Sequence, residues 1–418
     1  MNKEKGRVPK LRFPGFTEDW EQRKLGDLIL LNGRIGFRGY TEADIVSKDE
    51  GGVLTFSPTN IVDNRITIKC KNTYITRLKY DESPEIKVYN GDILFVKTGS
   101  TLGKSALVKD IFEDATLNPQ IVVMRPNNLS SEFLSIMMLT DNILSQVRKS
   151  RIGGAVPTLT ESTIKAFDTF IPENNEEAQK IGKIFGCLDD VITLHQRKLE
   201  HLNLKKKALL QKLFPKNGER YPELRFPGFT DAWEQCKLGD FAEIVRGASP
   251  RPISDPKWFD NDSNVGWLRI ADVTAQDGRI RYLEQKISEL GQEKTRVIKT
   301  PHLLLSIAAT VGKPVINYIP TGVHDGFLIF LNPKFNILYA FWWLEMFREK
   351  WNKYGQPGSQ VNLNSDLVKN QVINIPNEKE QEKISSFLES LDKIITLHQC
   401  KLEHLQLQKK ALLQQMFV

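Results

Sequence analysis

The sequence is poor in cysteine and has no long apolar stretch, and both features exclude some classes of protein. Its 418 residues include four cysteines, Cys70, Cys187, Cys236 and Cys400, and no two of them have a CxxC spacing. Neither a zinc knuckle nor a redox pair is indicated, and scattered single cysteines suit a reducing compartment. No apolar run approaches the roughly 20 residues of a membrane-spanning helix, and the first residues, MNKEKGRVPKLRF, are charged rather than signal-like. We therefore expect a cytoplasmic protein that does not enter a membrane.

Sequence motifs for catalysis are also missing. No Gly-rich cofactor fingerprint follows a strand and opens a helix, and no NPPY or DPPY segment is present for N-methylation of a base. GSTLGKS (99–105) resembles a phosphate-binding loop but has one residue too few between its glycines, and the corresponding AATVGKP (308–314) lacks the first glycine. We interpret both segments as tight turns after a strand, in which Lys104 and Lys313 contact a backbone phosphate. A plain hairpin turn is the alternative.

The charge balance favours, without proving, a polyanionic partner. Lysine and arginine together number 58 against 51 acidic residues, which leaves a formal net charge of +7. Many proteins of ordinary function are equally basic, so the distribution of the charge matters more than its total.

The chain is a tandem repeat. LRFPGFTEDWEQRKLGD (11–27) returns as LRFPGFTDAWEQCKLGD (224–240) with 14 of 17 positions identical, and residues 188–214 return as 391–417 with 20 of 27 identical. Residues 28–170 and 241–375, between these ends, share only a loose skeleton. One scaffold therefore occurs twice, and if both copies do the same job, the divergent middles should differ in what they recognise.

The repeated ends that close each copy are predicted to be long helices that pair. Their apolar positions recur at alternating steps of three and four, which is a heptad seam, and acidic residues cluster where each helix starts. An apolar stripe of that length needs a partner, and the other copy, in antiparallel orientation, is the obvious one. The residues expected to pair the helices are Leu188, Ile192, His195, Leu199, Leu202, Leu209, Leu391, Ile395, His398, Leu402, Leu405 and Leu412.

Histidines recur in both helices. His195 and His398 fall on the seam, where polar residues fix the register of a coiled coil. His201 and His404 follow six residues later and therefore lie on a different helix face, so a shared metal is disfavoured.

The divergent middles are predicted to be mainly β-structure. Residues 53–75, 91–99 and 118–126 in the first copy, and 267–283, 302–310 and 326–333 in the second, are rich in β-branched and aromatic residues. Gly, Pro and Asn punctuate them, as is typical of short strands and turns. Residues 133–150 and 339–354 are predicted to be helical at matching places in the two copies.

Basic residues with interleaved aromatics stand out in these middles. Arginine and lysine bind phosphates, and arginine also reads guanine edges, although an ordinary solvated surface explains any single residue as well. With the two turn lysines, the candidate DNA-binding residues are Arg34, Arg38, Arg65, Lys69, Lys71, Lys104, Arg246, Arg251, Lys257, Arg269, Arg279, Arg281 and Lys313.

Over nearly its whole length, the chain resembles the specificity subunit of type I restriction–modification systems. The resemblance rests on LRFPGF…W near the start of each copy, the GDILF…GK turn, the NL/TL…IK…IP closing segment and the LD..I.LHQ.KLEHL..KKALLQ.F helix. It implies an α+β fold with two mainly β target recognition domains, each followed by a long helix, the helices pairing as an antiparallel coiled coil. The expected boundaries are 1–172 and 217–376 for the domains, and 173–216 and 377–418 for the helices.

The resemblance also implies a function. Each recognition domain would read one half of a bipartite, asymmetric site in double-stranded DNA, and the helices would set the gap between the halves. Two methylation subunits with S-adenosylmethionine and restriction subunits with ATP-driven translocation and magnesium would be the partners, so no catalytic residue, metal or cofactor is expected in this chain. The alternatives are a scaffold that holds two partner proteins without DNA, and a nuclease or NTPase that uses GSTLGK.

The repeat makes one further prediction, about the chain ends. The first helix ends near Phe214 and the second LRFPGF begins at Leu224, so the two are held close by a short linker. If a pseudo-twofold relates the copies, the LRFPGF at 11–16 should lie near Phe417 at the end of the second helix.

Overall fold

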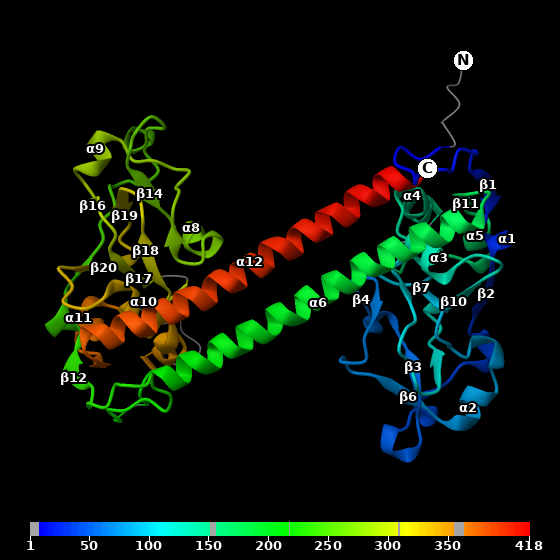
Figure 1. The fold of residues 1–418 in the computed structure, drawn as a ribbon, viewed down its shortest axis with the longest axis horizontal. Helices are drawn as coiled ribbons and strands as arrows, with labels where there is room; N and C mark the ends of the chain where they lie inside the picture. The colour runs from blue at the N-terminus through cyan, green and yellow to red at the C-terminus, as the bar shows by residue number, and fades with distance from the viewer. Residues whose placement is uncertain (1–7, 151–155, 217, 308–309, 355–362) are drawn as a thin grey trace. The chain divides into compact units, whose positions relative to one another are not determined.

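The computed structural model describes residues 8–150, 156–216, 218–307, 310–354 and 363–418 (Figure 1). It divides into two compact units. Unit 1 comprises residues 1–196 and 400–418, and unit 2 comprises residues 197–399. Each unit therefore combines one β-rich middle with segments of both long helices, and each is described by itself below.

The core of unit 1 is a mixed six-stranded sheet with the strand order β2-β10-β7-β8-β5-β4. A three-stranded sheet, β6-β3-β9, packs against it. The strand bounds are β2 Ile29–Gly33, β3 Val53–Phe56, β4 Ile61–Val62, β5 Arg65–Ile66, β6 Thr73–Ile75, β7 Ile93–Val96, β8 Ser105–Leu107, β9 Ala115–Leu117 and β10 Ile121–Pro126.

Strand β7 shows why this sheet is buried on both faces. All four of its residues, ILFV, are inaccessible to solvent. Because side chains alternate across a strand, Ile93 and Phe95 pack with the helices, whereas Leu94 and Val96 pack toward the three-stranded sheet. A continuous apolar run of this kind is what a strand between two layers requires.

Short helices cover unit 1. The segment predicted as one helix over 133–150 is two, α3 Ser131–Met137 and α4 Asp141–Ser150. The hydroxyl of Ser130 caps α3 by accepting a hydrogen bond from the backbone N–H of Phe133. The other short helices of unit 1 are α1 Leu25–Leu28, α2 Arg77–Asp81, α5 Glu161–Lys165 and the 3-10 turns Gly36–Arg38, Glu42–Asp44, Lys48–Glu50, Pro58–Asn60 and Pro84–Ile86.

Unit 2 repeats this plan. A five-stranded sheet of order β13-β20-β17-β18-β15 is accompanied by a three-stranded sheet, β14-β19-β16. The strands are β13 Glu243–Arg246, β14 Gly266–Leu268, β15 Arg279–Ile280, β16 Arg296–Ile298, β17 Leu303–Ser306, β18 Pro314–Asn317, β19 Thr321–Val323 and β20 Phe327–Leu331. The helices are α7 Leu238–Phe241, α8 Ile270–Ala275, α9 Glu289–Gln292, α10 Ile337–Phe347 and α11 Ser365–Lys369, with 3-10 segments at Pro256–Trp258 and Arg348–Tyr354.

A two-stranded ladder links the start and the end of each β-rich middle. In unit 1, β1 Glu21–Lys24 pairs antiparallel with β11 Asp168–Ile171, and in unit 2, β12 Glu234–Lys237 pairs antiparallel with β21 Val372–Ile375. The repeated sequence before each middle is thus hydrogen-bonded to the closing strand, which leads directly into a long helix.

The long helices α6 Asn175–Leu213 and α12 Glu378–Met416 are 39 residues each. Within unit 2 they run antiparallel, because Leu202 of α6 packs with Leu391 and Ile395, whereas Leu213, further along α6, packs near Ile384. Within unit 1 the same orientation places Asp189 of α6 against Lys409 of α12, with 2.6 Å between the carboxylate and the ammonium nitrogen. The predicted antiparallel pairing is confirmed.

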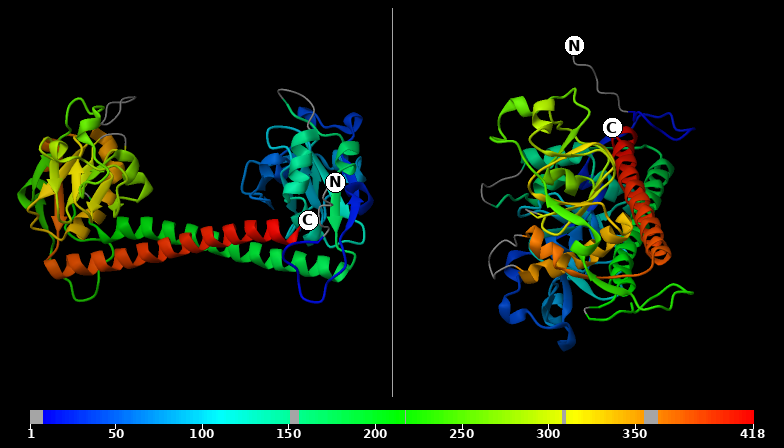
Figure 2. Two further views of the ribbon diagram at one scale, coloured as in Figure 1. Left: turned by 90° about the horizontal axis from the view of Figure 1, so that it is seen from above. Right: turned by 90° about the vertical axis from the view of Figure 1, so that its left-hand side faces the viewer.

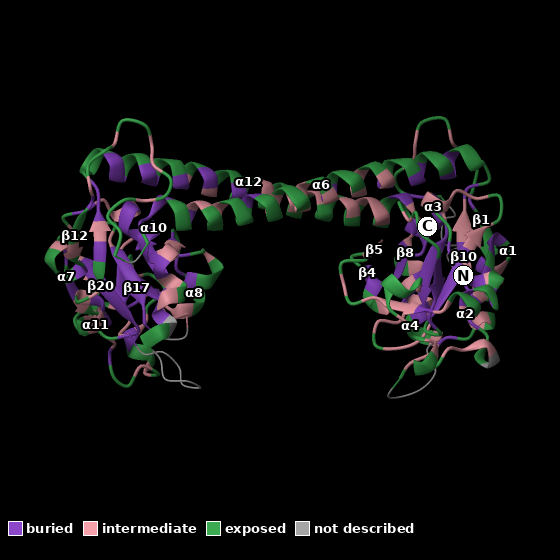
Figure 3. Ribbon diagram, turned by 90° about the horizontal axis from the view of Figure 1, so that it is seen from below, coloured by how far each residue is buried: buried purple, intermediate pink, exposed green. Residues whose placement is uncertain are grey.

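The residues predicted to form the seam are buried or partly buried along both helices. Ile192, Leu202, Leu391 and Ile395 are buried. Leu188, His195, Leu199, Leu209, His398, Leu402, Leu405 and Leu412 are partly buried, whereas His201 and His404 are exposed. Figure 3 shows the resulting alternation of buried and exposed residues along the two ribbons.

The predicted meeting of the chain ends is also confirmed. In unit 2 the backbone N–H of Leu224 donates to the carbonyl of Lys212 at 2.9 Å, and in unit 1 the N–H of Leu11 donates to Gln415 at 2.8 Å. The Trp20 ring lies edge-on to Phe417, as Trp233 lies edge-on to Phe214. The views in Figures 1 and 2 agree that the end of α12 lies beside the first segment of the chain.

One buried ion pair recurs at this join. Arg12 forms two hydrogen bonds, of 2.7 and 2.8 Å, to the carboxylate of Glu177 near the start of α6. Arg225 does the same to Glu380 of α12 at 2.8 Å. Both glutamates are fully buried. A bidentate guanidinium–carboxylate pair in each unit therefore ties the LRFPGF segment to the helix that begins there.

Candidate nucleic-acid interface

The GSTLGKS turn is a β-hairpin. Gly103 donates its backbone N–H to Val96 at the end of β7, and Val96 donates back to Lys104. Gly99 and Gly103 have φ of +112° and +90°, which side chains other than glycine rarely adopt. The chain then enters strand β8 rather than a helix, so the context that a phosphate-binding P-loop requires is not present.

The two turn lysines have different surroundings. Lys104 is exposed, and with Arg65, Lys409 and Lys410 it lines a hollow of about 480 Å³ between the β-rich part of unit 1 and its helices. Lys313 is buried, and its ammonium group contacts Asp277 at 2.6 Å and Glu345 at 3.3 Å. The geometry at Lys104 therefore leaves a charge available to a ligand, whereas the charge of Lys313 is neutralised inside unit 2.

Two predicted DNA contacts instead touch the long helices. The guanidinium of Arg65, on β5, donates to the backbone carbonyl of Asp189 on α6. That of Arg279, on β15, pairs with Glu389 on α12 and lies 3.8 Å from the centre of the Phe341 ring. In both units an arginine from a short strand thus fixes the β-rich part to a helix.

The remaining basic candidates of unit 1 are spread over its surface and interior. Arg34 is 5% exposed and donates to the Leu117 carbonyl at 2.8 Å, and burial lowers its pKa from the ordinary value. Arg38 bonds to Glu85 at 3.3 Å. Lys69 and Lys71 are exposed on the segment after β5. Arg34 is therefore placed to support the fold, and the two lysines are placed to meet a ligand.

Three exposed arginines of unit 2 gather around one aspartate. Arg251 pairs with the carboxylate of Asp325 at 2.6 Å, and Arg246 donates to the backbone carbonyl of Asp325 at 2.7 Å. Arg296 joins them by donating to the carbonyl of Arg246 at 2.8 Å. One carboxylate among three exposed guanidinium groups leaves a net positive surface, here named the arginine cluster (Arg246, Arg251 and Arg296).

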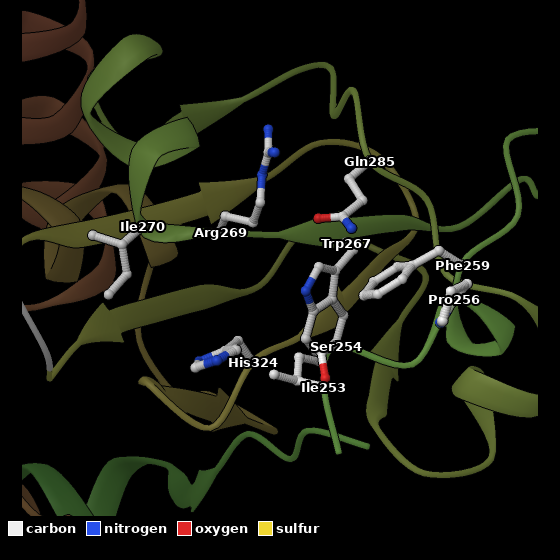
Figure 4. Close-up of a pocket in the computed structure, with 9 residues that line it drawn as sticks. All are labelled: Ile253, Ser254, Pro256, Phe259, Trp267, Arg269, Ile270, Gln285 and His324. Carbon is white, nitrogen blue, oxygen red and sulfur yellow. The ribbon is translucent and has the colours of Figure 1, made fainter. Parts of the chain in front are cut away.

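A pocket adjoins the arginine cluster. It has a volume of about 730 Å³ and is largely apolar (Figure 4). Its lining residues are Ile253, Ser254, Pro256, Phe259, Trp267, Arg269, Ile270, Gln285 and His324. The loop that carries Arg251 continues into Ile253 and Ser254, and His324 immediately precedes Asp325. The cluster and the pocket are therefore parts of one surface.

The pocket has a rigid aromatic wall. Trp267 is 2% exposed and packs with Val265 and Ile287. Its ring lies edge-on to Phe259 at 6.4 Å and to His324 at 5.8 Å between centroids. Side chains held in this way lose little freedom when a ligand binds.

The surroundings of His324 disfavour the charged form of its ring. Burial lowers its pKa, and the charges of Arg251 and Arg246 add to that effect, whereas Asp325 opposes it. Its Nδ1 accepts a hydrogen bond from the backbone N–H of Gly326 at 2.9 Å. The same ring nitrogen lies 3.1 Å from the Asp325 carboxylate.

The other basic candidates of unit 2 have defined partners. Arg269 holds Asp272 with two hydrogen bonds, of 3.2 and 3.0 Å. Lys257 pairs with Asp255 at 2.9 Å and lies over the Trp258 ring, and Arg281 lies over Tyr318 at 4.7 Å. Lys257 and Arg281 remain exposed.

Sequence reasoning did not single out Arg296, Phe259, Gln285 or His324. They are separated by loops and come together only because β14, β16 and β19 form one sheet. A signal for Arg296 was present, since it lies in a middle already rich in arginine. Nothing in the sequence marked Gln285 or His324.

Within 8–150, 156–216, 218–307, 310–354 and 363–418, no group of three or more His, Cys, Asp or Glu is arranged to hold a metal ion. Among the helices of these same ranges, none is both long and apolar enough to cross a membrane.

Comparison with known proteins connects the chain to a family. The model of the type I restriction modification DNA specificity domain matches the chain twice, over residues 17–204 and 230–407. The two matches correspond to the two copies of the repeat. A curated relative from Methanocaldococcus jannaschii, described as a putative type I restriction enzyme MjaX specificity subunit, is 23% identical over 97% of this chain and 94% of its own length.

Two solved structures share the fold. The S subunit of a type I restriction–modification system from M. genitalium aligns with a TM-score of 0.64 at 13% identity, over 98% of this chain and 99% of that one. A chain from a structure described as the basis of complex assembly and conformational transition of the type I R-M system aligns with a TM-score of 0.56 at 18% identity, over 97% and 98%.

Proposed function

The chain belongs to the family built from the type I restriction–modification DNA specificity domain, and from that premise we propose that its two β-rich middles each read one half of a bipartite, asymmetric DNA site. Members of this family are specificity subunits, which recognise DNA for a complex whose catalysis resides in other subunits. The proposal names what each part of this chain does in that role.

The observation that carries the proposal is the repeat itself. Two units with the same strand plan and nearly identical ends carry different side chains on their middles. Two readers of one fold suit the twofold character of a DNA duplex, and their different side chains suit two different half-sites. The recognition domains would be residues 1–172 and 217–376, with the spacer helices at 173–216 and 377–418.

The side chains best placed for DNA backbone contacts are the exposed basic ones. In unit 1 these are Lys69, Lys71 and Lys104, and in unit 2 they are Arg246, Arg251, Lys257 and Arg281. Each neutralised phosphate releases counterions, so these residues would contribute affinity that falls with salt. Arg34, Arg65, Arg279 and Lys313 would act indirectly, because their charged groups already bind within the protein.

The partners follow from the family. Two methylation subunits that bind S-adenosylmethionine, and restriction subunits that use ATP and Mg²⁺ to translocate DNA, would dock on this chain in the cytoplasm. α6 and α12 would set the number of base pairs between the half-sites. A relative named as a specificity subunit and a similar chain from a type I complex support this assignment.

Sequencing of methylated adenines tests the proposal. Cells that express the chain with its methylation subunits should show one bipartite motif, and the motif should be absent when the chain is left out. Replacing residues 28–170 with the corresponding segment of another family member should change one half of the motif and leave the other half as it was. A motif that is unchanged, or that changes in both halves, would contradict independent reading.

A gel-shift assay separates this function from a scaffold that does not bind DNA. The chain with its methylation subunits should bind a duplex that contains the motif identified by sequencing more tightly than a scrambled duplex. Equal binding of both duplexes would favour the scaffold.

A further inference from the structure

The pocket of unit 2 presents two kinds of surface side by side. Ile253, Pro256 and Phe259 supply an apolar wall against the buried Trp267 ring. At the rim, Figure 4 shows the Gln285 amide directed toward the Trp267 indole. A ligand that fits must therefore offer an apolar group and, next to it, a partner for a carboxamide.

The Gln285 amide is held in place and available. Its backbone carbonyl accepts a hydrogen bond from the N–H of Trp267 at 2.8 Å, which fixes the residue beside β14. Within the described part of unit 2, no hydrogen bond involves its side-chain amide. The amide can therefore donate through its nitrogen and accept through its oxygen at the same time.

Arg269, another polar residue that lines the pocket, is not available in the same way. Both Nε and one terminal nitrogen of its guanidinium bind Asp272, and Glu284 lies 3.6 Å from it. Figure 4 shows its side chain extending away from the aromatic wall. A bidentate contact to guanine, which would need two free N–H groups, is therefore disfavoured.

Among the base pairs, only A·T presents in the major groove both an apolar group and a partner for a carboxamide. Adenine offers N7 as an acceptor and N6 as a donor, which a glutamine amide binds with two hydrogen bonds. The thymine paired with it carries the C5-methyl, the one apolar group on that edge. The arginine cluster next to the pocket supplies positive charge for the neighbouring phosphates.

We propose that this pocket reads one A·T pair of the half-site recognised by unit 2, with Gln285 bonded to adenine N6 and N7 and with Ile253 and Phe259 against the thymine methyl. This inference rests on the proposed function and names the base pair and the side chains that read it. The Trp267 ring backs both contacts and holds the wall rigid.

Base analogues test each contact separately. The half-site is first established by methylome sequencing, and the chain with its methylation subunits is titrated with duplexes that carry one analogue at a time. 7-Deazaadenine removes only N7, and deoxyuridine removes only the thymine methyl. At one A·T pair, the first should weaken binding by roughly 5-fold or more, and the second by about 4-fold.

Variants then assign these effects to side chains. In Gln285→Ala, 7-deazaadenine at that pair should no longer weaken binding, whereas deoxyuridine still should. In Ile253→Ala the effect of deoxyuridine should become smaller, because only Phe259 still contacts the methyl, whereas 7-deazaadenine should still weaken binding. Gln408→Ala, at an exposed glutamine of α12, is the matched control and should respond to both analogues as the wild type does.

The outcomes distinguish this inference from the proposed function. If both variants respond to every analogue as the wild type does, or if no pair responds to both analogues, the pocket assignment is wrong while sequence-specific binding stands. If the wild-type complex does not prefer its motif over a scrambled duplex, the proposed function itself fails. A half-site without an A·T pair also overturns the assignment.

Discussion

The buried pair between Arg225 and Glu380 should be a main determinant of the stability of unit 2. Glu380 is fully buried, the Arg225 side chain is 15% exposed, and two hydrogen bonds of 2.8 Å join them. The change Arg225→Ala removes both bonds and leaves a carboxylate without its counter-charge inside the protein. Breaking a buried pair on one side costs about 3–5 kcal/mol, so we expect the free energy of unfolding of unit 2 to fall by that amount.

Urea unfolding followed by tryptophan fluorescence measures this change. Of the seven tryptophans only Trp20 lies in unit 1, so the signal reports mainly on unit 2. The control is Lys212→Ala, which breaks a half-exposed pair with Glu223 near the same join. Such a pair contributes about 0–1 kcal/mol.

Two further variants sharpen the interpretation. Replacing both partners, Arg225→Met with Glu380→Leu, removes the unpaired charge and should recover most of the loss. Arg12→Ala should destabilise unit 1 in the same way, because Arg12 and Glu177 repeat the pair there. If Arg225→Ala costs no more than Lys212→Ala, the buried pair does not hold the LRFPGF segment to the helix, and the reasoning is refuted.

Four other changes have defined outcomes. Burial lowers the pKa of His324, so the unfolded chain binds a proton at this histidine more readily than the folded chain, and the stability that the neutral ring contributes is lost as the pH falls below about 6.5. The difference in unfolding free energy between wild type and His324→Gln should therefore narrow from pH 7 to about 5. A difference that stays constant over this range would contradict the prediction. Gly312→Ala should lower the unfolding free energy by about 2 kcal/mol or more, because φ is +78° and a Cβ would lie 2.4 Å from Trp351. The control is Gly218→Ala, where φ is +84° but the added Cβ meets open space. It should lower the unfolding free energy by less. Inserting four residues before Leu199 adds about 6 Å of helix. Because one base pair spans about 3.4 Å, the gap of the methylated motif should lengthen by one or two base pairs while both half-sites stay the same. An unchanged gap would exclude a spacer role for the helices. Joining the chain ends through a flexible segment and opening the linker between α6 and β12 should preserve the motif, and a folded permutant with an altered motif would show that the two joins are not equivalent.

Much of the architecture could be predicted from the sequence because it is written in local patterns. The two helices follow from heptad spacing, which is typical of helices that pair in a coiled coil, and their antiparallel pairing agrees with the structure. The meeting of Leu11 with the end of α12 followed from the repeat alone, since a pseudo-twofold requires at one join what the linker enforces at the other. The short break between α3 and α4 was not predicted, because neither glycine nor proline interrupts residues 133–150.

The availability of each basic side chain was decided by the tertiary structure. Lys104 and Lys313 occupy corresponding turns, yet one is exposed and the other is neutralised by Asp277 and Glu345, which lie far from it in the sequence. Arg65 and Arg279 carry the same charge as Arg251, but their strands place them against a helix. A charged residue type indicates that a partner is needed, and only the folded chain determines whether that partner is inside the protein or outside it. Periodicity along one chain thus encoded the helices and the repeat, while the pocket at Trp267 and Gln285 arose from strands and loops that only folding brings together.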